Sequence, residues 1–417
     1  MGVALFARLA TFLLLLAPGA RAQEPSPLLA APAVAPPAAV APPAAIEPKQ
    51  PAASPTITST PWDLVELLSQ TVAPGDRRRL SLRAGESFAG DAVDIPVLVL
   101  RGNTPGPTLC FVAGVHGDEL NGIEIVREVF EGIAPRDLSG MLIGVPVANV
   151  HGLRRSSRYL PDQRDLNRFF PGHPGGSSAS RIANALFEGV VGDCDALVDF
   201  HTGSFQRTNL PQVRGDLRVP RILELAKGFG TGEIVHSEGR AGTLRRAAVD
   251  AGVPSVTFEA GEPLRFQAKE IERGVAGVHG LLASLRMLPG EKPRRAHRVY
   301  YRSRWLRVND GGIFLAQRKL GDAVQVGDVL GTVTDPVTNE RSTVIAPFQG
   351  RIIGMAVPQV VIPGFAAFHI GVESPAVPEP AEPEPAEPEP AESEASPAVE
   401  PAPALRPDQL DPEEAPE

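Results

Sequence analysis

Apolar and polar positions form two different patterns along the chain, one in residues 94–287 and another in residues 299–372. Between residues 94 and 287, short apolar runs of strand type recur with stretches whose apolar positions repeat at helical spacing. The strand-type runs are 94–102, 107–113, 140–147, 195–201 and 253–261. The helical repeats are 123–130, 180–191 and 269–287. Strands that alternate with helices predict an α/β domain with a mostly parallel sheet flanked by helices.

The pattern changes between residues 299 and 372, where glycines separate short strand-like pieces. This spacing predicts a small all-β sandwich or barrel. The Gly-Asp-Val-Leu-Gly piece at 327–331 and the Ala-Pro-Phe-Gln-Gly piece at 346–350 resemble biotinyl/lipoyl-attachment domains. Such carrier domains have a lysine on the hairpin between these pieces, and the hairpin 334–341 has none. We therefore expect a module that walls the active-site cleft or mediates assembly, without a cofactor-carrying arm.

Both ends of the chain differ in composition from the middle. Residues 1–22 have a short basic start, an apolar run and an Ala-Arg-Ala ending, which predict a cleaved secretory signal. Residues 23–60 are rich in Pro and Ala and predict an extended linker. Glu-Pro and Pro-Ala units in 374–417 predict a disordered acidic tail. The α/β domain is then assigned to 61–290 and the β domain to 295–373.

The negative charge of the chain belongs to this tail. The chain has a formal net charge of −9, whereas residues 374–417 hold 13 acidic residues and one Arg, a net of −12, which leaves +3 for the rest. The charge therefore says nothing about the substrate, and no basic stripe indicates a nucleic-acid partner. After the signal no apolar run reaches the roughly 18 residues of a membrane helix, so we expect no membrane anchor. An exported, periplasmic or secreted protein is expected, in an oligomeric state that the sequence leaves open.

His116 and Glu119 lie where a strand-type run ends and a helical repeat begins, among several glycines. An imidazole and a carboxylate three residues apart can face one point at such a turn and bind a divalent metal, most naturally zinc. A solvated histidine beside a helix-capping acid is the alternative. His201 and Glu259 each end another strand-type run, which is where open α/β sheets place their sites.

The loop 149–172 is rich in arginine, and guanidinium groups bind carboxylates through paired hydrogen bonds. Within it we expect Arg158, Asn167 and Arg168 to be functional and the other arginines to be solvated.

Four segments together resemble the succinylglutamate desuccinylase/aspartoacylase family of the zinc carboxypeptidase superfamily. They are His-Gly-Asp-Glu at 116–119, Asp-Leu-Asn-Arg-Phe-Phe-Pro-Gly at 165–172, Asp-Phe-His-Thr-Gly at 199–203 and Thr-Phe-Glu-Ala-Gly at 257–261. The resemblance implies a zinc-carboxypeptidase-like fold. It also implies that His116, Glu119 and His201 ligate one zinc ion and that Glu259 is the catalytic carboxylate.

The same resemblance implies that Arg158 polarises the scissile carbonyl and that Asn167 and Arg168 hold a substrate carboxylate. Two additional residues separate Arg158 from the Asn-Arg pair compared with aspartoacylase-like members, so Arg154 or Arg155 could take its place. Cys110 and Cys194 precede the two histidines by six and seven residues. In an exported chain they could form a disulfide or stay as two buried thiols.

The resulting hypothesis is a deacylase that cleaves an amide or ester bond near a free carboxylate, with zinc-activated water and Glu259 as base. The substrate would be a small molecule, such as an N-acyl amino acid, or a peptide. A metallocarboxypeptidase acting on exported or cell-wall peptides is the alternative that export favours. A non-catalytic binding protein on the same fold is the second alternative, although the sequence retains Glu259 and all three metal ligands.

Overall fold

The computed structural model describes residues 64–86, 92–293 and 297–373. The predicted signal, linker and tail lie outside these residues. Within the described ranges, no helix combines the length and the apolar character that crossing a membrane requires.

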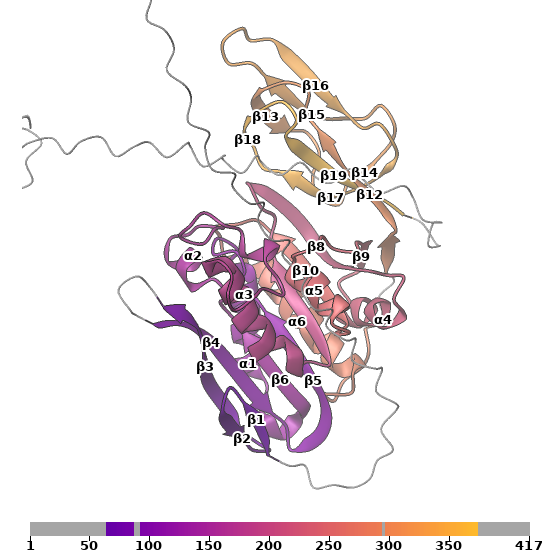
Figure 1. Cartoon of the computed structure of the whole chain (residues 1–417). Helices are drawn as coiled ribbons and strands as arrows, with labels where there is room; N and C mark the ends of the chain where they lie inside the picture. The colour runs from indigo at the N-terminus through magenta and orange to yellow at the C-terminus, as the bar shows by residue number, and fades with distance from the viewer. Residues whose placement is uncertain (1–63, 87–91, 294–296, 374–417) are drawn as a thin grey trace, which may run out of the picture. The chain divides into compact units, whose positions relative to one another are not determined.

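A sheet of 13 strands organises the chain, and its centre is parallel as predicted (Figure 1). The parallel strands are β5 (Thr104–Val112), β6 (Ser139–Val145), β7 (Ala196–His201) and β10 (Ser255–Gly261). β5 lies between β6 and β7, and β7 lies beside β10. Antiparallel neighbours are β4 (Ala92–Arg101) and β3 (Arg77–Glu86) beyond β6, and β8 (Arg207–Gly215) beside β10. β9 (Glu233–His236) pairs with β8.

Helices cover both faces of this sheet because the strands alternate their side chains. On β5, Leu109 and Phe111 pack with α1 (Asn121–Gly132), α4 (Pro220–Phe229) and α6 (Ala268–Ser284). Cys110 and Val112 point to the opposite face, with α3 (Ser178–Gly189) and α5 (Leu244–Asp250). Strands buried on both faces are apolar throughout, which explains their continuous apolar runs. Short helices are α2 (Val150–Arg154), η1 (Pro135–Asp137), η2 (Leu166–Arg168) and η3 (Val191–Asp193).

The last described segment is all β, as predicted. One sheet has the order β16 (Arg341–Ile345), β15 (Val329–Thr334), β13 (Gly312–Ala316) and β18 (Gln359–Val361). The remaining strands are β11 (Arg298–Tyr300), β12 (Arg302–Arg307), β14 (Ala323–Val324), β17 (Gly350–Ala356) and β19 (Ala366–Val372). At the start of the described chain, β1 (Val65–Leu67) and β2 (Gln70–Val72) form a separate two-stranded antiparallel sheet. We call residues 298–372 the β region.

The β region continues the large sheet, because β17 pairs with β8 through Gly354 and Asn209. The larger sheet therefore runs in the order β12-β19-β17-β8-β10-β7, from the β region into the parallel strands. The predicted boundary between the two domains at about residue 290 stays a prediction.

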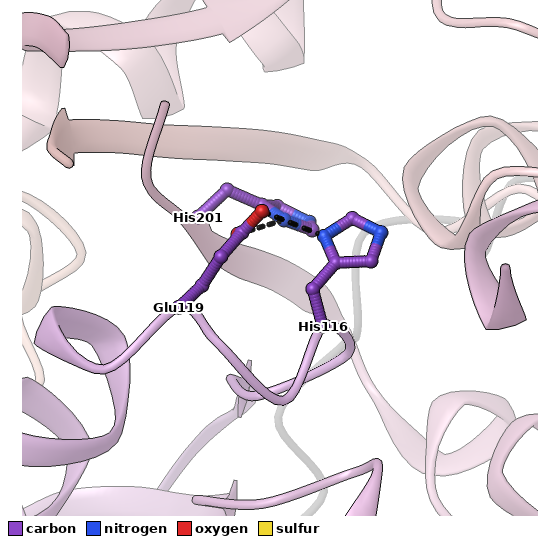
Figure 2. Close-up of side chains that lie close together, drawn as sticks. All are labelled: His116, Glu119 and His201. Carbon is purple, nitrogen blue, oxygen red and sulfur yellow. Dashed lines mark hydrogen bonds and ion pairs between the residues drawn. The ribbon is translucent and has the colours of Figure 1, made fainter. Parts of the chain in front are cut away.

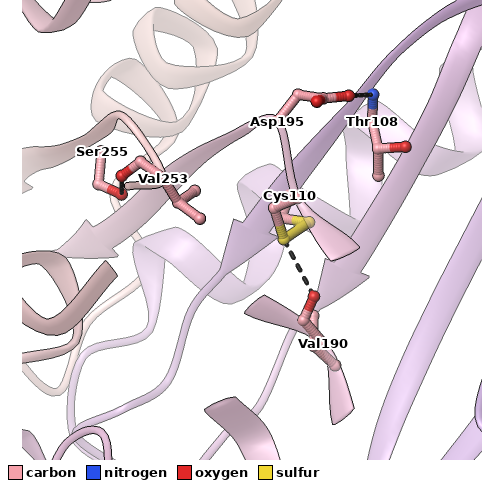
Figure 3. Close-up of a disulfide and its surroundings, with 7 residues drawn as sticks. Thr108, Cys110, Val190, Asp195, Val253 and Ser255 are labelled. Carbon is pink, nitrogen blue, oxygen red and sulfur yellow. Dashed lines mark hydrogen bonds between the residues drawn. A yellow bond between two sulfur atoms is a disulfide. The ribbon is translucent and has the colours of Figure 1, made fainter. Parts of the chain in front are cut away.

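Cys110 on β5 and Cys194, just before β7, form a disulfide with a Cα–Cα distance of 5.8 Å (Figure 3). Close by, the Thr108 amide donates a hydrogen bond to Asp195 Oδ2 at 2.9 Å. The structure thus contains the paired form of the two alternatives that the sequence left open. The bond joins neighbouring parallel strands that lead to His116 and His201.

Candidate active site

The site lies at the carboxyl ends of the parallel strands, where their register places the polar residues side by side. Glu259 on β10 pairs in register with His201 on β7, and Asp199 pairs with Val112 on β5. The chain then leaves β5 in a tight loop that carries His116 and Glu119 before α1 begins. A Cβ atom at Gly117 would come 1.9 Å from the backbone carbon of Gly152, so this loop requires glycine there.

Three buried side chains converge as the sequence predicted (Figure 2). His116 Nδ1 lies 2.8 Å from Glu119 Oε1, and His201 Nδ1 lies 2.8 Å from Glu119 Oε2. One donor atom from each residue lies within 4.8 Å of the others. We call His116, Glu119 and His201 the metal-ligand cluster, since nitrogen and carboxylate donors at this separation suit a divalent ion such as zinc.

The second nitrogen of each imidazole faces a carboxylate. His116 Nε2 lies 3.0 Å from Asp165 Oδ1, and His201 Nε2 lies 2.9 Å from Asp199 Oδ2. Metal-binding histidines commonly use the other ring nitrogen in this way, which fixes the tautomer and the ring orientation. Both aspartates lie in the segments that carry the resemblance, but the sequence analysis did not assign them this part. The available signal was the position of Asp199 two residues before His201; Asp165, far from the ligands in the sequence, had no such signal.

The electrostatics of the cluster reflect these pairs. Burial opposes ionisation of Glu119, yet His116 and His201 outweigh it and hold the Glu119 pKa far below its ordinary value. Burial likewise opposes protonation of His201, but Asp199 and Glu119 raise its pKa well above the usual range. The cluster therefore combines buried negative and positive groups, and a divalent cation bound there would take the place of the imidazole protons.

Arg158 reaches the cluster and the two alternative arginines do not. Its Nη1 donates to Glu119 Oε1 at 3.2 Å and its Nη2 donates to Asp165 Oδ2 at 2.9 Å. Its guanidinium also lies 5.3 Å from the centroid of the Phe205 ring. Arg154 and Arg155 are exposed at the end of α2. The position agrees with the predicted site, while the part that Arg158 plays in catalysis stays a prediction.

The Asn-Arg pair lies in η2, and its two side chains are used differently. Asn167 is buried and its Oδ1 accepts a hydrogen bond from the Leu244 amide at 2.8 Å, which anchors the start of α5. Arg168 is partly exposed, its Nη1 donates to the Asn167 carbonyl at 3.0 Å, and it lies 3.7 Å from Asp165 Oδ2. The structure thus brings Arg168 beside Asp165, which contacts His116, while the predicted binding of a substrate carboxylate by Asn167 and Arg168 stays a prediction.

Both oxygens of Glu259 have partners on β8. Asn209 Nδ2 donates to Glu259 Oε2 at 2.8 Å, and Arg214 Nη1 lies 3.5 Å from Glu259 Oε1. Sequence reasoning missed both partners because it did not identify β8 as a strand. The β region in turn contacts β8. Gly354 of β17 pairs with Asn209, and the Ala366 carbonyl accepts a hydrogen bond from Arg207 Nε at 2.9 Å.

Comparison with known proteins places these features in a family. Residues 105–285 match the model of the succinylglutamate desuccinylase/aspartoacylase catalytic domain. The chain is 28% identical over 265 residues to N-alpha-acetyl-L-2,4-diaminobutyric acid deacetylase of Halomonas elongata, covering 60% of this chain and 77% of that protein. It is 30% identical over 207 residues to succinylglutamate desuccinylase of Burkholderia pseudomallei, covering 44% of this chain and 58% of that protein. The fold matches a succinylglutamate desuccinylase/aspartoacylase structure from Rhodobacter sphaeroides with a TM-score of 0.65 and 22% identity, covering 73% of this chain and 98% of that chain.

Proposed function

Because the chain belongs to the succinylglutamate desuccinylase/aspartoacylase family, we propose that this hydrolase is zinc-dependent and cleaves an N-acyl amino acid at an amide or ester bond near a free carboxylate. The relatives are named as a deacetylase and a desuccinylase of amino acids, which supports an N-acyl amino acid as the substrate class. The observation that carries the proposal is the convergence of the metal-ligand cluster next to Glu259.

The residues present fit a zinc ion. His116, Glu119 and His201 would hold it, since their donor atoms converge and the second imidazole nitrogens are already oriented by Asp165 and Asp199. Zinc bound there would supply Lewis-acid activation of water and of the scissile carbonyl.

Side chains of the protein would then transfer the proton, stabilise the developing charge and bind the substrate carboxylate. Glu259 would accept a proton from the attacking water and deliver it to the leaving nitrogen as the C–N bond breaks, giving a free acid and a free amine. Arg158 would stabilise the negative charge that develops on the carbonyl oxygen. Arg168, with the amide nitrogen of Asn167, would hold the substrate carboxylate.

Export is part of the proposal. The pattern of residues 1–22 supports it, and so does the Cys110–Cys194 disulfide, because such bonds persist mainly in oxidising compartments.

The test uses the protein from residue 23 onward, loaded with zinc and incubated with N-acetyl and N-succinyl amino acids and with short peptides, with products read by mass spectrometry. We expect release of free amino acids and one zinc per chain. Glu259→Gln should keep the zinc and lose about 10²- to 10⁴-fold in kcat, the range typical of general acid–base catalysis. Glu262→Gln is the matched control, since Glu262 pairs with Arg265 at 2.7 Å. Near-normal turnover by zinc-loaded Glu259→Gln protein would refute the mechanism.

A further inference from the structure

Three exposed apolar side chains lie on the two loops that follow β7 and β10. In the described α/β residues 64–86 and 92–293, the exposed large apolar side chains are Phe205, Leu264 and Phe266, with exposed fractions of 38%, 56% and 62%, and Leu64 at the first described position. One loop follows β7, which carries His201, and the other follows β10, which carries Glu259. Single exposed apolar residues are ordinary, but a local concentration at a site marks a binding surface.

Hydrogen bonds tie both loops to the site. The Gly203 amide donates to the Gly261 carbonyl at 2.9 Å, which joins the bases of the two loops. The Leu264 amide donates at 2.7 Å to the carbonyl of Asp118, the residue before the metal ligand Glu119. The Phe205 ring lies 5.3 Å from the Arg158 guanidinium carbon, and Arg158 contacts Glu119 directly. A group that packs on Phe205 therefore lies within the site.

Two of the three side chains lie on backbone of unfavourable conformation. Phe205 and Leu264 have φ values of 52° and 61°, in the left-handed region that bulky side chains disfavour and that Gly and Asn adopt more readily. Residues held in such conformations concentrate at functional sites. The neighbouring Gln206 is held as well, because its carbonyl accepts hydrogen bonds from the Val357 amide at 3.0 Å and from Gln359 Nε2 at 2.8 Å.

We propose that Phe205, Leu264 and Phe266 form an apolar rim that binds an apolar group flanking the scissile bond of the substrate. This inference rests on the proposed function and narrows its substrate class. The preferred substrates are N-acyl amino acids or peptides that carry an aromatic or aliphatic group next to the amide, and compounds with a small acyl group on an acidic residue are poorer. The apolar group can belong to the amino acid or to the acyl chain, since both flank the bond.

The test compares three substrates with the zinc-loaded protein: N-acetyl-L-phenylalanine, N-benzoyl-L-aspartate and N-acetyl-L-aspartate. We expect one of the first two to exceed the third by about 10-fold or more in kcat/KM, a selectivity that apolar pockets commonly reach. Which of the two is preferred shows whether the rim contacts the amino acid or the acyl group. Phe205→Asn and Leu264→Asn, which suit the left-handed conformation, should each lower the apolar-to-acidic kcat/KM ratio several-fold. Val337→Asn, at a side chain that is 90% exposed in the β region, should leave the ratio unchanged.

Two negative results are distinguishable. Hydrolysis of N-acetyl-L-aspartate at a rate equal to that of both apolar substrates, or an unchanged ratio in Phe205→Asn and Leu264→Asn, would overturn the rim and leave the proposed function intact. Failure of the zinc-loaded protein to hydrolyse any N-acyl amino acid or peptide would overturn the proposed function, and the rim with it.

Discussion

Asn209 donates a hydrogen bond from Nδ2 to Glu259 Oε2 at 2.8 Å, across the junction of β8 and β10. Arg214 on the same strand lies 3.5 Å from the other carboxylate oxygen, so β8 contacts both oxygens of Glu259. A carboxylate that must take a proton and return it depends on such support, because small misplacements of a catalytic group are costly. β8 therefore belongs to the catalytic apparatus that we propose, although it carries no metal ligand.

Replacing Asn209 by Ala should lower kcat by about 10- to 100-fold, the usual cost of removing a hydrogen bond to a charged group. KM and zinc content should change little, because Asn209 touches neither the cluster nor Arg168. Steady-state kinetics together with metal analysis check this expectation. A variant with normal kcat would show that the Asn209 hydrogen bond does not position Glu259.

The β region should influence turnover through the same hydrogen bond. A Cβ atom at Gly354 of β17 would come 2.7 Å from Asn209 Oδ1 and 3.2 Å from the His369 Cβ. Gly354→Ala should therefore displace Asn209 and lower kcat while the active-site side chains remain in place. Gly132→Ala is the matched control, since a Cβ there meets nothing within 4 Å. Equal kcat values for the two variants would show that the β region does not influence turnover through Asn209.

Several signals, each modest alone, together predicted that His116, Glu119 and His201 lie close to one another and to Glu259. His116 follows β5, His201 ends β7 and Glu259 lies near the end of β10, and parallel strands bring their carboxyl ends to one edge of the sheet. The orienting aspartates Asp165 and Asp199 were harder to identify, since a carboxylate in a loop or strand has many uses and its partner is set by tertiary structure.

β8 was missed for a different reason. Its residues, Arg207–Gly215, include Pro211 and five polar side chains, and they show neither an apolar run nor a clear alternation. The strand forms because β10 and β17 lie on either side and supply its hydrogen bonds. Tertiary pairing of this kind outweighs local propensity and leaves no periodic signal. α5, with seven residues, is likewise too short for helical periodicity to identify.

Opening the disulfide should destabilise the protein without removing the site. Cys110 and Cys194 are 84 residues apart in the sequence, and closing a loop of that length contributes about 4.5 kcal/mol in the chain-entropy model. The double variant Cys110→Ala, Cys194→Ala should lower the free energy of unfolding by up to this amount in urea titrations. Wild-type protein treated with a reductant under denaturing conditions should lose a similar amount. An unchanged midpoint in both experiments would contradict a stabilising part for the bond.

Removal of zinc should lower the melting temperature of the wild type. A ligand present at 1,000 times its Kd stabilises the folded state by about 4 kcal/mol, and chelation removes that contribution. Scanning calorimetry with and without a chelator measures the difference. His201→Ala, which lacks one ligand, should melt at the same temperature in both conditions. A wild-type protein indifferent to the chelator would exclude a tightly bound metal at the cluster.

His369 should make the β region sensitive to acid. The side chain is buried on β19 and stacks on Trp305 with ring centroids 4.7 Å apart. Burial, aided by the positive charges of Arg214 and Arg207, holds its pKa well below the ordinary value, so the folded protein keeps this imidazole neutral. In the unfolded chain this imidazole takes up its proton at about pH 6.5. The contribution of neutral His369 to the free energy of unfolding is therefore complete above that pH. Below it, the contribution falls by about 1.4 kcal/mol per pH unit. Urea unfolding at pH 7.5 and 5.5 should therefore show a smaller acid-induced loss for His369→Gln than for the wild type, and equal losses would refute this assignment.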